Sequence, residues 1–196
     1  MNKYYFKISL FNLLIVLVIS IIFSYLLSNI LYRIPAYEKI EVFISSSYID
    51  EEVLIDRIDN IENIKEINII PRSINNNYYE DTLQTIGLYS DILIIPTSYL
   101  DTKEKAFSFS SIDESYFSSY NININDYELI SYDDSIYGII VYDKEKNIDL
   151  FKDIIVFEND DRYVLCIGKY TPNVMNEPKS NKETNNAFKV FMELIK

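Results

Sequence analysis

A chain of 196 residues has room for one domain of ordinary size and a short appendage. It carries 30 acidic and 18 basic residues, for a formal net charge of −12, which disfavours nucleic acid as a partner because phosphate neutralisation requires clustered Lys and Arg. Hydrophobic residues make up 48% of the chain, enough for a packed core, and the single Cys166 excludes an internal disulfide.

The first element along the chain is an uncharged apolar segment, residues 8–32, bracketed by Lys7 and Arg33. As a helix it would span about 37 Å, more than the roughly 30 Å hydrocarbon core of a bilayer. No good small-x-small cleavage site follows it, and no lipid-anchoring Cys does. The segment therefore predicts a transmembrane helix that acts as an uncleaved signal anchor.

The charges beside this segment predict its orientation. Two lysines and the terminal amine precede it, whereas Arg33 and Lys39 follow it, so the positive-inside count slightly favours a cytoplasmic N-terminus. We expect a single-pass protein of the cell membrane with two parts: an anchor and tether at residues 1–35, and an extracytoplasmic domain at residues 36–196.

After the tether, strands and helices alternate. Apolar alternation and apolar runs predict strands at 39–45, 66–70 and 91–95. Two helices are expected between them, the first capped by Asp50 and the second ended by Gly87 in a left-handed conformation. The strand at 91–95 is apolar on consecutive positions, as expected when helices cover both faces, so this order predicts a parallel sheet.

The second half of the chain predicts a further strand at 137–143 and then two strands within 154–168, joined as a hairpin by a turn at 158–161. A capping box of Ser180 and Glu183 predicts the start of a last helix. The expected fold class is α/β: an N-terminal transmembrane helix, then a single three-layer domain with a mainly parallel sheet and a C-terminal helix.

This order of elements resembles the first lobe of an extracellular solute-binding protein of bacterial ABC transporters, the type II periplasmic-binding fold. The resemblance rests on KIEVFIS as the opening strand, on its spacing to EINII, and on GLYSDILIIPTSYL. It extends to SIYGIIVY as the strand that would leave the lobe and YVLCIGKYTPN as the strand that would return to it. These patterns cover most of residues 39–195.

The chain departs from that family where its second lobe would be. Only residues 144–162 separate the departing strand from the returning one, so the second lobe is expected to be missing. A helical turn at 148–152 and the hairpin would take its place.

Candidate ligand contacts follow from the position of the strand ends. In an open parallel sheet, ligands bind at the carboxyl ends of the strands, and hydroxyl groups there can hydrogen-bond a sugar, a peptide or an anion. The candidates at these ends are Ser45, Ser46, Ser47, Thr97 and Ser98. The resemblance to solute-binding proteins adds Tyr137 and Asn173. The alternative is that these hydroxyls bond the local backbone, as Ser and Thr at strand ends commonly do.

Catalysis has little support in the sequence. The chain has no His, and neither a nucleophile motif nor a phosphate-binding loop occurs in it. The adjacent acids Asp133 and Asp134, or Asp160 and Asp161, leave an acidic-residue hydrolase as a minor alternative. We expect no catalytic residue, no metal site and no cofactor.

The preferred hypothesis is a membrane-anchored, non-catalytic binding or protein-interaction module. Its expected partners are the membrane, through residues 8–32, and a protein or a second copy of the chain. A small solute is a further candidate, and no nucleic acid is expected. The alternative is a sugar or peptide receptor component of an ABC transporter that needs a second chain to complete its site, since one lobe offers a ligand only one wall.

Overall fold

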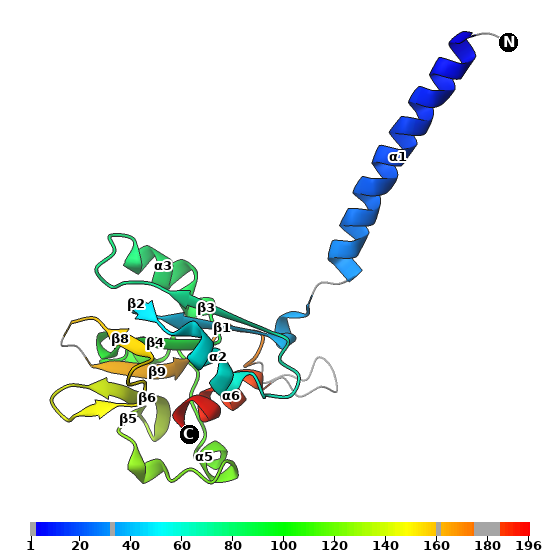
Figure 1. The fold of residues 1–196 in the computed structure, drawn as a ribbon. Helices are drawn as coiled ribbons and strands as arrows, with labels where there is room; N and C mark the ends of the chain where they lie inside the picture. The colour runs from blue at the N-terminus through cyan, green and yellow to red at the C-terminus, as the bar shows by residue number, and fades with distance from the viewer. Residues whose placement is uncertain (1–2, 32–33, 160–161, 175–184) are drawn as a thin grey trace. The chain divides into compact units, whose positions relative to one another are not determined.

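The computed structural model describes residues 3–31, 34–159, 162–174 and 185–196 (Figure 1). The chain divides into two compact units, Met1–Pro35 and Ala36–Lys196.

The first unit contains helix α1 (Lys3–Leu31). Its stretch Phe11–Ser28 has a mean hydropathy of 2.4, and none of that stretch is buried. An exposed apolar helix of this length can cross a bilayer, and near the N-terminus it is consistent with a signal anchor or a signal peptide.

The second unit is built on a mixed seven-stranded sheet in the order β3-β1-β4-β9-β6-β5, with β7 beside β6. Its strands are β1 (Lys39–Ile44), β3 (Glu66–Pro71), β4 (Ile92–Pro96), β5 (Leu129–Tyr132), β6 (Ser135–Asp143), β7 (Ile148–Asp149) and β9 (Tyr163–Ile167). A separate two-stranded sheet pairs β2 (Ser46–Ile49) with β8 (Ile155–Phe157).

Five helices accompany the sheets in the described part of this unit: α2 (Glu51–Ile58), α3 (Tyr79–Thr85), α4 (Lys103–Ala106), α5 (Glu114–Ser119) and α6 (Asn186–Ile195). Short 3-10 turns are η1 (Ala36–Glu38), η2 (Gly87–Tyr89), η3 (Thr97–Tyr99) and η4 (Ile124–Asp126). The expected cap of the first of these helices is confirmed, because the Asp50 carboxylate accepts a hydrogen bond of 3.3 Å from the Val53 amide.

The α/β class is confirmed, but the expectation of a mainly parallel sheet is wrong. Strand β1 pairs in parallel with β3 and β4, as the alternation of strands and helices predicted. The pairs β4–β9, β9–β6, β6–β5 and β6–β7 are all antiparallel. Antiparallel neighbours need no crossover helix, and the short connections after β5 supply none.

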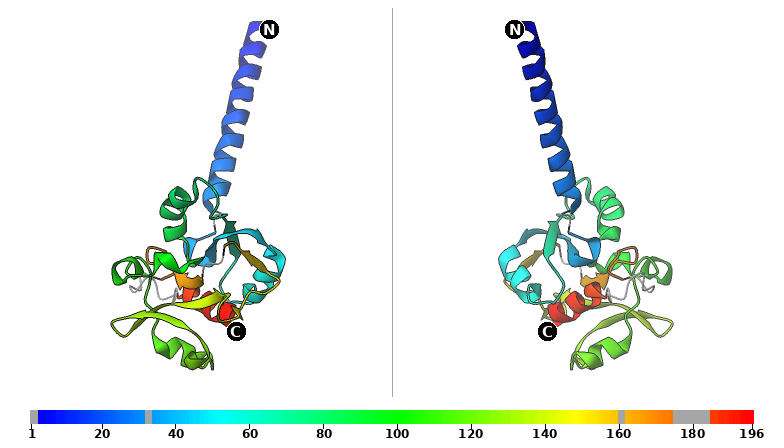
Figure 2. Two further views of the ribbon diagram at one scale, coloured as in Figure 1. Left: turned by 90° about the vertical axis from the view of Figure 1, so that its left-hand side faces the viewer. Right: turned by 90° about the vertical axis from the view of Figure 1, so that its right-hand side faces the viewer.

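Burial on both faces of the central strand shows why the domain is layered. In β4, Ile92 and Ile94 belong to one core cluster, which also contains residues of α2 and α6, whereas Leu93 and Ile95 belong to the other, with residues of α3. Figure 2 shows α2 and α6 beside each other, and the two helices are in contact. The prediction that helices cover both faces of this strand is confirmed.

The expected hairpin of the last two strands is wrong. Strand β8 pairs with β2, and β9 lies between β4 and β6 instead of beside β8. All residues of β9 are buried, so this strand needs cover on both faces, which a surface hairpin would not give. The expected helical turn at 148–152 is also replaced, at its start, by strand β7.

The role expected for Gly87 is wrong as well. No glycine in the described ranges has a positive φ, so Gly87 is not a left-handed cap. A Cβ atom at this position would lie 2.7 Å from Leu83 Cδ1, so close packing at the start of η2 favours glycine.

The expected last helix begins at Asn186, and Ala187, Val190, Phe191 and Leu194 are among its buried residues. The capping box of Ser180 and Glu183 lies outside the described residues.

Candidate functional site

The sheet has a point where strand order reverses. The chain makes β1, then β3, then β4, but in space β1 lies between the other two. In open α/β sheets, ligands bind outside the carboxyl ends of the strands at such a point. Ser45, Ser46 and Ser47 follow β1, and Thr97 and Ser98 follow β4, so five of the predicted ligand residues lie at this edge.

Two of these hydroxyls are engaged inside the protein. The fully buried Ser45 shares a hydrogen bond of 2.5 Å with the hydroxyl of Tyr79 in α3. The buried Ser46 Oγ lies 2.7 Å from the Val156 carbonyl oxygen and 2.8 Å from that of Tyr48. These contacts match the alternative interpretation, in which strand-end hydroxyls bond local groups.

The other three residues at this edge are more accessible. Ser47 is exposed and hydrogen-bonds the Glu158 carboxylate. Thr97 is half-buried, and its amide donates a hydrogen bond of 2.8 Å to the Arg162 carbonyl. Ser98 is exposed, and its carbonyl accepts a hydrogen bond of 2.8 Å from Lys105 Nζ.

Two tyrosines stand beside the strand ends. The rings of Tyr79 and Tyr99 lie 6.2 Å apart, and the Tyr99 hydroxyl donates a hydrogen bond to the Glu80 carboxylate. Burial raises the pKa of both tyrosines, so their hydroxyls remain protonated at neutral pH. Both hydroxyls are therefore neutral, and each is engaged within the protein, Tyr79 with Ser45 and Tyr99 with Glu80.

Asn173 lies at the other end of these strands, beside the starts of β1 and β4. Its buried amide nitrogen donates hydrogen bonds of 2.8 Å to the Lys39 carbonyl and 2.8 Å to the Asp91 carboxylate, next to the starts of β1 and β4. Burial raises the pKa of Asp91, although hydrogen bonds from Thr171, the Glu41 backbone and Asn173 oppose that rise. Asn173 thus links the start of β1 to Asp91 by hydrogen bonds, and it lies away from the five candidate residues at the carboxyl ends of the strands.

Tyr137 lies in a different hollow, of about 490 Å³. This hollow is lined by five aromatic side chains together with Val174, Lys169 and three hydroxyl residues, and its size falls within the range of small-molecule sites. Phe107 and Tyr170 line it while 43% and 60% exposed. The sequence analysis did not predict either residue as a ligand contact. For Tyr170 the available indication was its position in KYTPN, directly after the returning strand.

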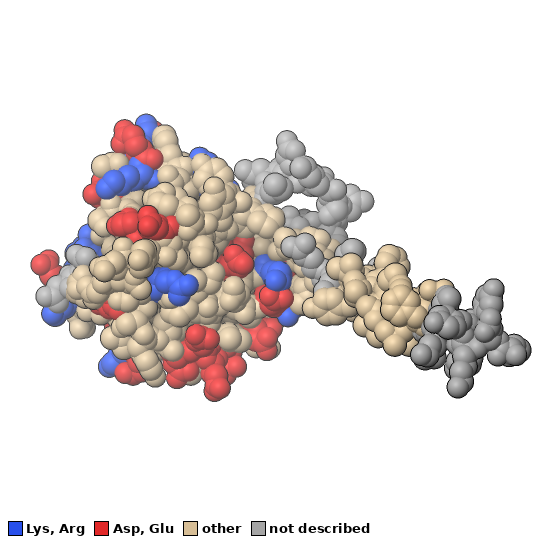
Figure 3. Space-filling model, turned by 90° about the horizontal axis from the view of Figure 1, so that it is seen from above, with Lys and Arg blue, Asp and Glu red and all other residues tan. Residues whose placement is uncertain are grey.

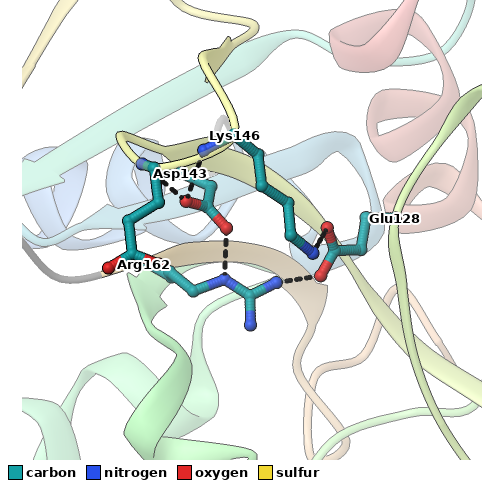
Figure 4. Close-up of polar contacts among 5 residues, drawn as sticks. Glu128, Asp143, Lys146 and Arg162 are labelled. Carbon is teal, nitrogen blue, oxygen red and sulfur yellow. Dashed lines mark hydrogen bonds and ion pairs between the residues drawn. The ribbon is translucent and has the colours of Figure 1, made fainter.

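Ion pairs among four charged side chains link the residue before β9 to residues at the ends of β5 and β6 (Figure 4). Arg162 Nε lies 2.6 Å from the buried carboxylate of Asp143, and the same guanidinium contacts Glu128, which also binds Lys146. Burial raises the pKa of Asp143, but hydrogen bonds from the Lys146 and Glu145 amides and the charge of Arg162 outweigh it, so the pKa is lowered. Each carboxylate faces a cation, an arrangement that positions β9.

The acid pair of Asp133 and Asp134 forms the turn between β5 and β6. Both residues have positive φ angles, of 49° and 59°, as the two central residues of a type I′ hairpin turn do. Asp133 pairs with Lys103, and its side chain is 66% exposed. Turn geometry therefore accounts for this pair, while Asp160 and Asp161 lie outside the described residues. In the ranges that the structure describes, no group of three or more His, Cys, Asp or Glu residues could hold a metal ion.

Comparisons of the chain with protein-family models, with curated proteins and with solved structures found no match.

The bond between Ser45 and Tyr79 gives a testable prediction. Ser45→Ala leaves the buried Tyr79 hydroxyl without this partner, and Tyr79→Phe does the same to Ser45, so each is expected to lower the free energy of unfolding by about 1 to 3 kcal/mol. The double variant should lose less than the sum of the two, by about 1 kcal/mol, in a double-mutant cycle followed by urea unfolding. Strictly additive losses would show that the two hydroxyls are not partners and would leave Ser45 free for a ligand.

Proposed function

We propose that the protein is a non-catalytic binding module that α1 holds in the cell membrane and whose α/β domain lies outside the cytoplasm. The support for an anchor is the exposed, uncharged stretch Phe11–Ser28. The slight excess of positive charge before α1 supports the orientation.

The observation that carries the proposal is the path of the chain around β9. The chain leaves the sheet through β6 and returns as β9, which runs antiparallel between β6 and β4. A departing and a returning strand are what the resemblance to the first lobe of a solute-binding protein implies. Between them, Phe151, Ile154 and Ile155 pack into the same core as β1 and β4, so the described residues of this interval extend the lobe instead of building a second one.

A single lobe favours a protein partner over an enclosed solute. Small-molecule sites usually bury about 70 to 90% of their ligand, and one wall does not achieve this. Exposed aromatic side chains are good anchors for a protein interface because they bury a large area with few rotatable bonds. Among the described residues after position 36, the tyrosines that are 58% exposed or more are Tyr48, Tyr78, Tyr89 and Tyr170. On the face seen in Figure 3, basic side chains are scattered among acidic ones, a distribution that does not favour nucleic acid.

The second candidate is a sugar or peptide receptor component of an ABC transporter whose site is completed by another chain. It is favoured by the hollow that Tyr137 lines, because aromatic rings and a few polar groups line it, as in small-molecule sites.

A ligand screen on residues 36–196 tests the proposal. Both core clusters consist of residues after position 36, so this part is expected to fold by itself. We expect a monomer on size exclusion and no concentration-dependent rise in Tm with sugars, amino acids or short peptides. A dimer whose Tm rises with one of these solutes would favour the second candidate and contradict the first.

A further inference from the structure

Glu158, just after β8, places its carboxylate against the loop that follows β3. One of its oxygens, Oε2, accepts hydrogen bonds of 2.7 Å from the Ser73 hydroxyl, 3.0 Å from the Ile74 amide and 3.3 Å from the Asn75 side-chain amide. The hydroxyl of Ser47, beside the carboxyl end of β1, also bonds this carboxylate. Donors from two strand ends thus converge on one side-chain anion.

The groups that the structure shows around this carboxylate are neutral hydroxyls and amides. Burial raises the pKa of Glu158, but these hydrogen bonds outweigh that effect, and the net pKa is lowered. Several donors aimed at one oxygen form an anion-binding concavity of the kind that backbone amides and hydroxyls build at loops. The surroundings therefore favour a negatively charged occupant.

The donors are held by contacts that do not involve Glu158. The Asn75 amide donates a hydrogen bond of 3.2 Å to Ser73 Oγ, and the Asn76 amide donates one of 3.1 Å to the Ser73 carbonyl. Ile74 packs against the core cluster that contains Tyr79. Contacts independent of Glu158 therefore help to hold the loop, while Glu158 itself is half-buried directly after a three-residue strand.

We propose that Ser47, Ser73, Ile74 and Asn75 form a carboxylate-binding cradle, in which Glu158 is an internal occupant that external carboxylates can replace. The ligand class is a single carboxylate group. An internal carboxylate competes at a high effective concentration, so an external one binds well only when Glu158 is withdrawn or removed. The cradle is a local property of these loops, and the proposal goes beyond the membrane-anchored binding function without depending on it.

Chemical rescue tests this proposal on the full chain in detergent micelles, with sodium acetate as the probe and sodium chloride at equal ionic strength as the control. Glu158→Ala is expected to lower Tm, and acetate is expected to restore it saturably. The apparent affinity for acetate should be roughly tenfold or more above that of the unchanged protein, in which Glu158 competes. A matched control is Glu80→Ala, which removes an exposed carboxylate bonded by the single Tyr99 hydroxyl and should show no rescue.

A second variant covers the case in which Glu158→Ala does not fold. Glu158→Asp retracts the carboxylate by one methylene and is expected to show the same acetate response with a smaller amplitude. The proposal is overturned if acetate acts no differently from chloride on the variants that fold, or if it stabilises Glu80→Ala equally.

Discussion

Replacing Gly168 by alanine is expected to lower the free energy of unfolding by about 3 kcal/mol, near the top of the range for overpacked positions. Gly168 is buried directly after β9, and its amide donates a hydrogen bond of 3.0 Å to the Asp91 carbonyl. A Cβ atom there would lie 2.0 Å from the carbonyl oxygen of Ser90. Because that oxygen belongs to the backbone, relief requires the start of β4 and the end of β9 to separate.

Urea unfolding of residues 36–196 measures this loss, with Gly87→Ala as the control. The closest atom to a Cβ at Gly87 is Leu83 Cδ1, the end of a flexible side chain that can move aside, so a loss of about 1 kcal/mol is expected. Equal losses for the two variants, or a smaller loss for Gly168→Ala, would show that β4 and β9 do not approach each other as closely as described.

Local patterns predicted the elements whose signals are local. The apolar patterns at 39–45 and in β4 predicted strands, and Asp50 predicted a helix cap within its own next turn; all three elements are confirmed, although Phe43, between the alternating apolar positions, is buried as well. Pairing partners are different, since they depend on contacts far along the chain. The sequence predicts both β8 and β9 as strands, and their proximity along the chain predicts a hairpin. In the structure β9 instead pairs with β4 and β6.

The candidate site divides in the same way. The strand ends that carry Ser45 and Thr97 follow from strand direction alone, so the edge could be predicted. Whether a hydroxyl there is free to bind a ligand could not be predicted, because the partner of Ser45 is Tyr79, which lies on another element. Asn173 was assigned from resemblance, and its contacts with Lys39 and Asp91 place it at the other end of these strands, beside the starts of β1 and β4.

The central claim is that the α/β domain lies on the outer side of the membrane. A cysteine at an exposed position of that domain should then react with a membrane-impermeant maleimide, and Ser98→Cys supplies one. The native Cys166 gives little background because it is fully buried, and burial raises the pKa of its thiol well above the usual value.

The decisive measurement is the labelling of Ser98→Cys in cells with an intact cytoplasmic membrane, compared with Asn2→Cys on the other side of the predicted span. The account predicts complete labelling of Ser98→Cys before lysis, labelling of Asn2→Cys only after lysis, and recovery of both chains in the membrane fraction. Labelling of Ser98→Cys only after lysis, or its recovery in the soluble fraction, would contradict the claim.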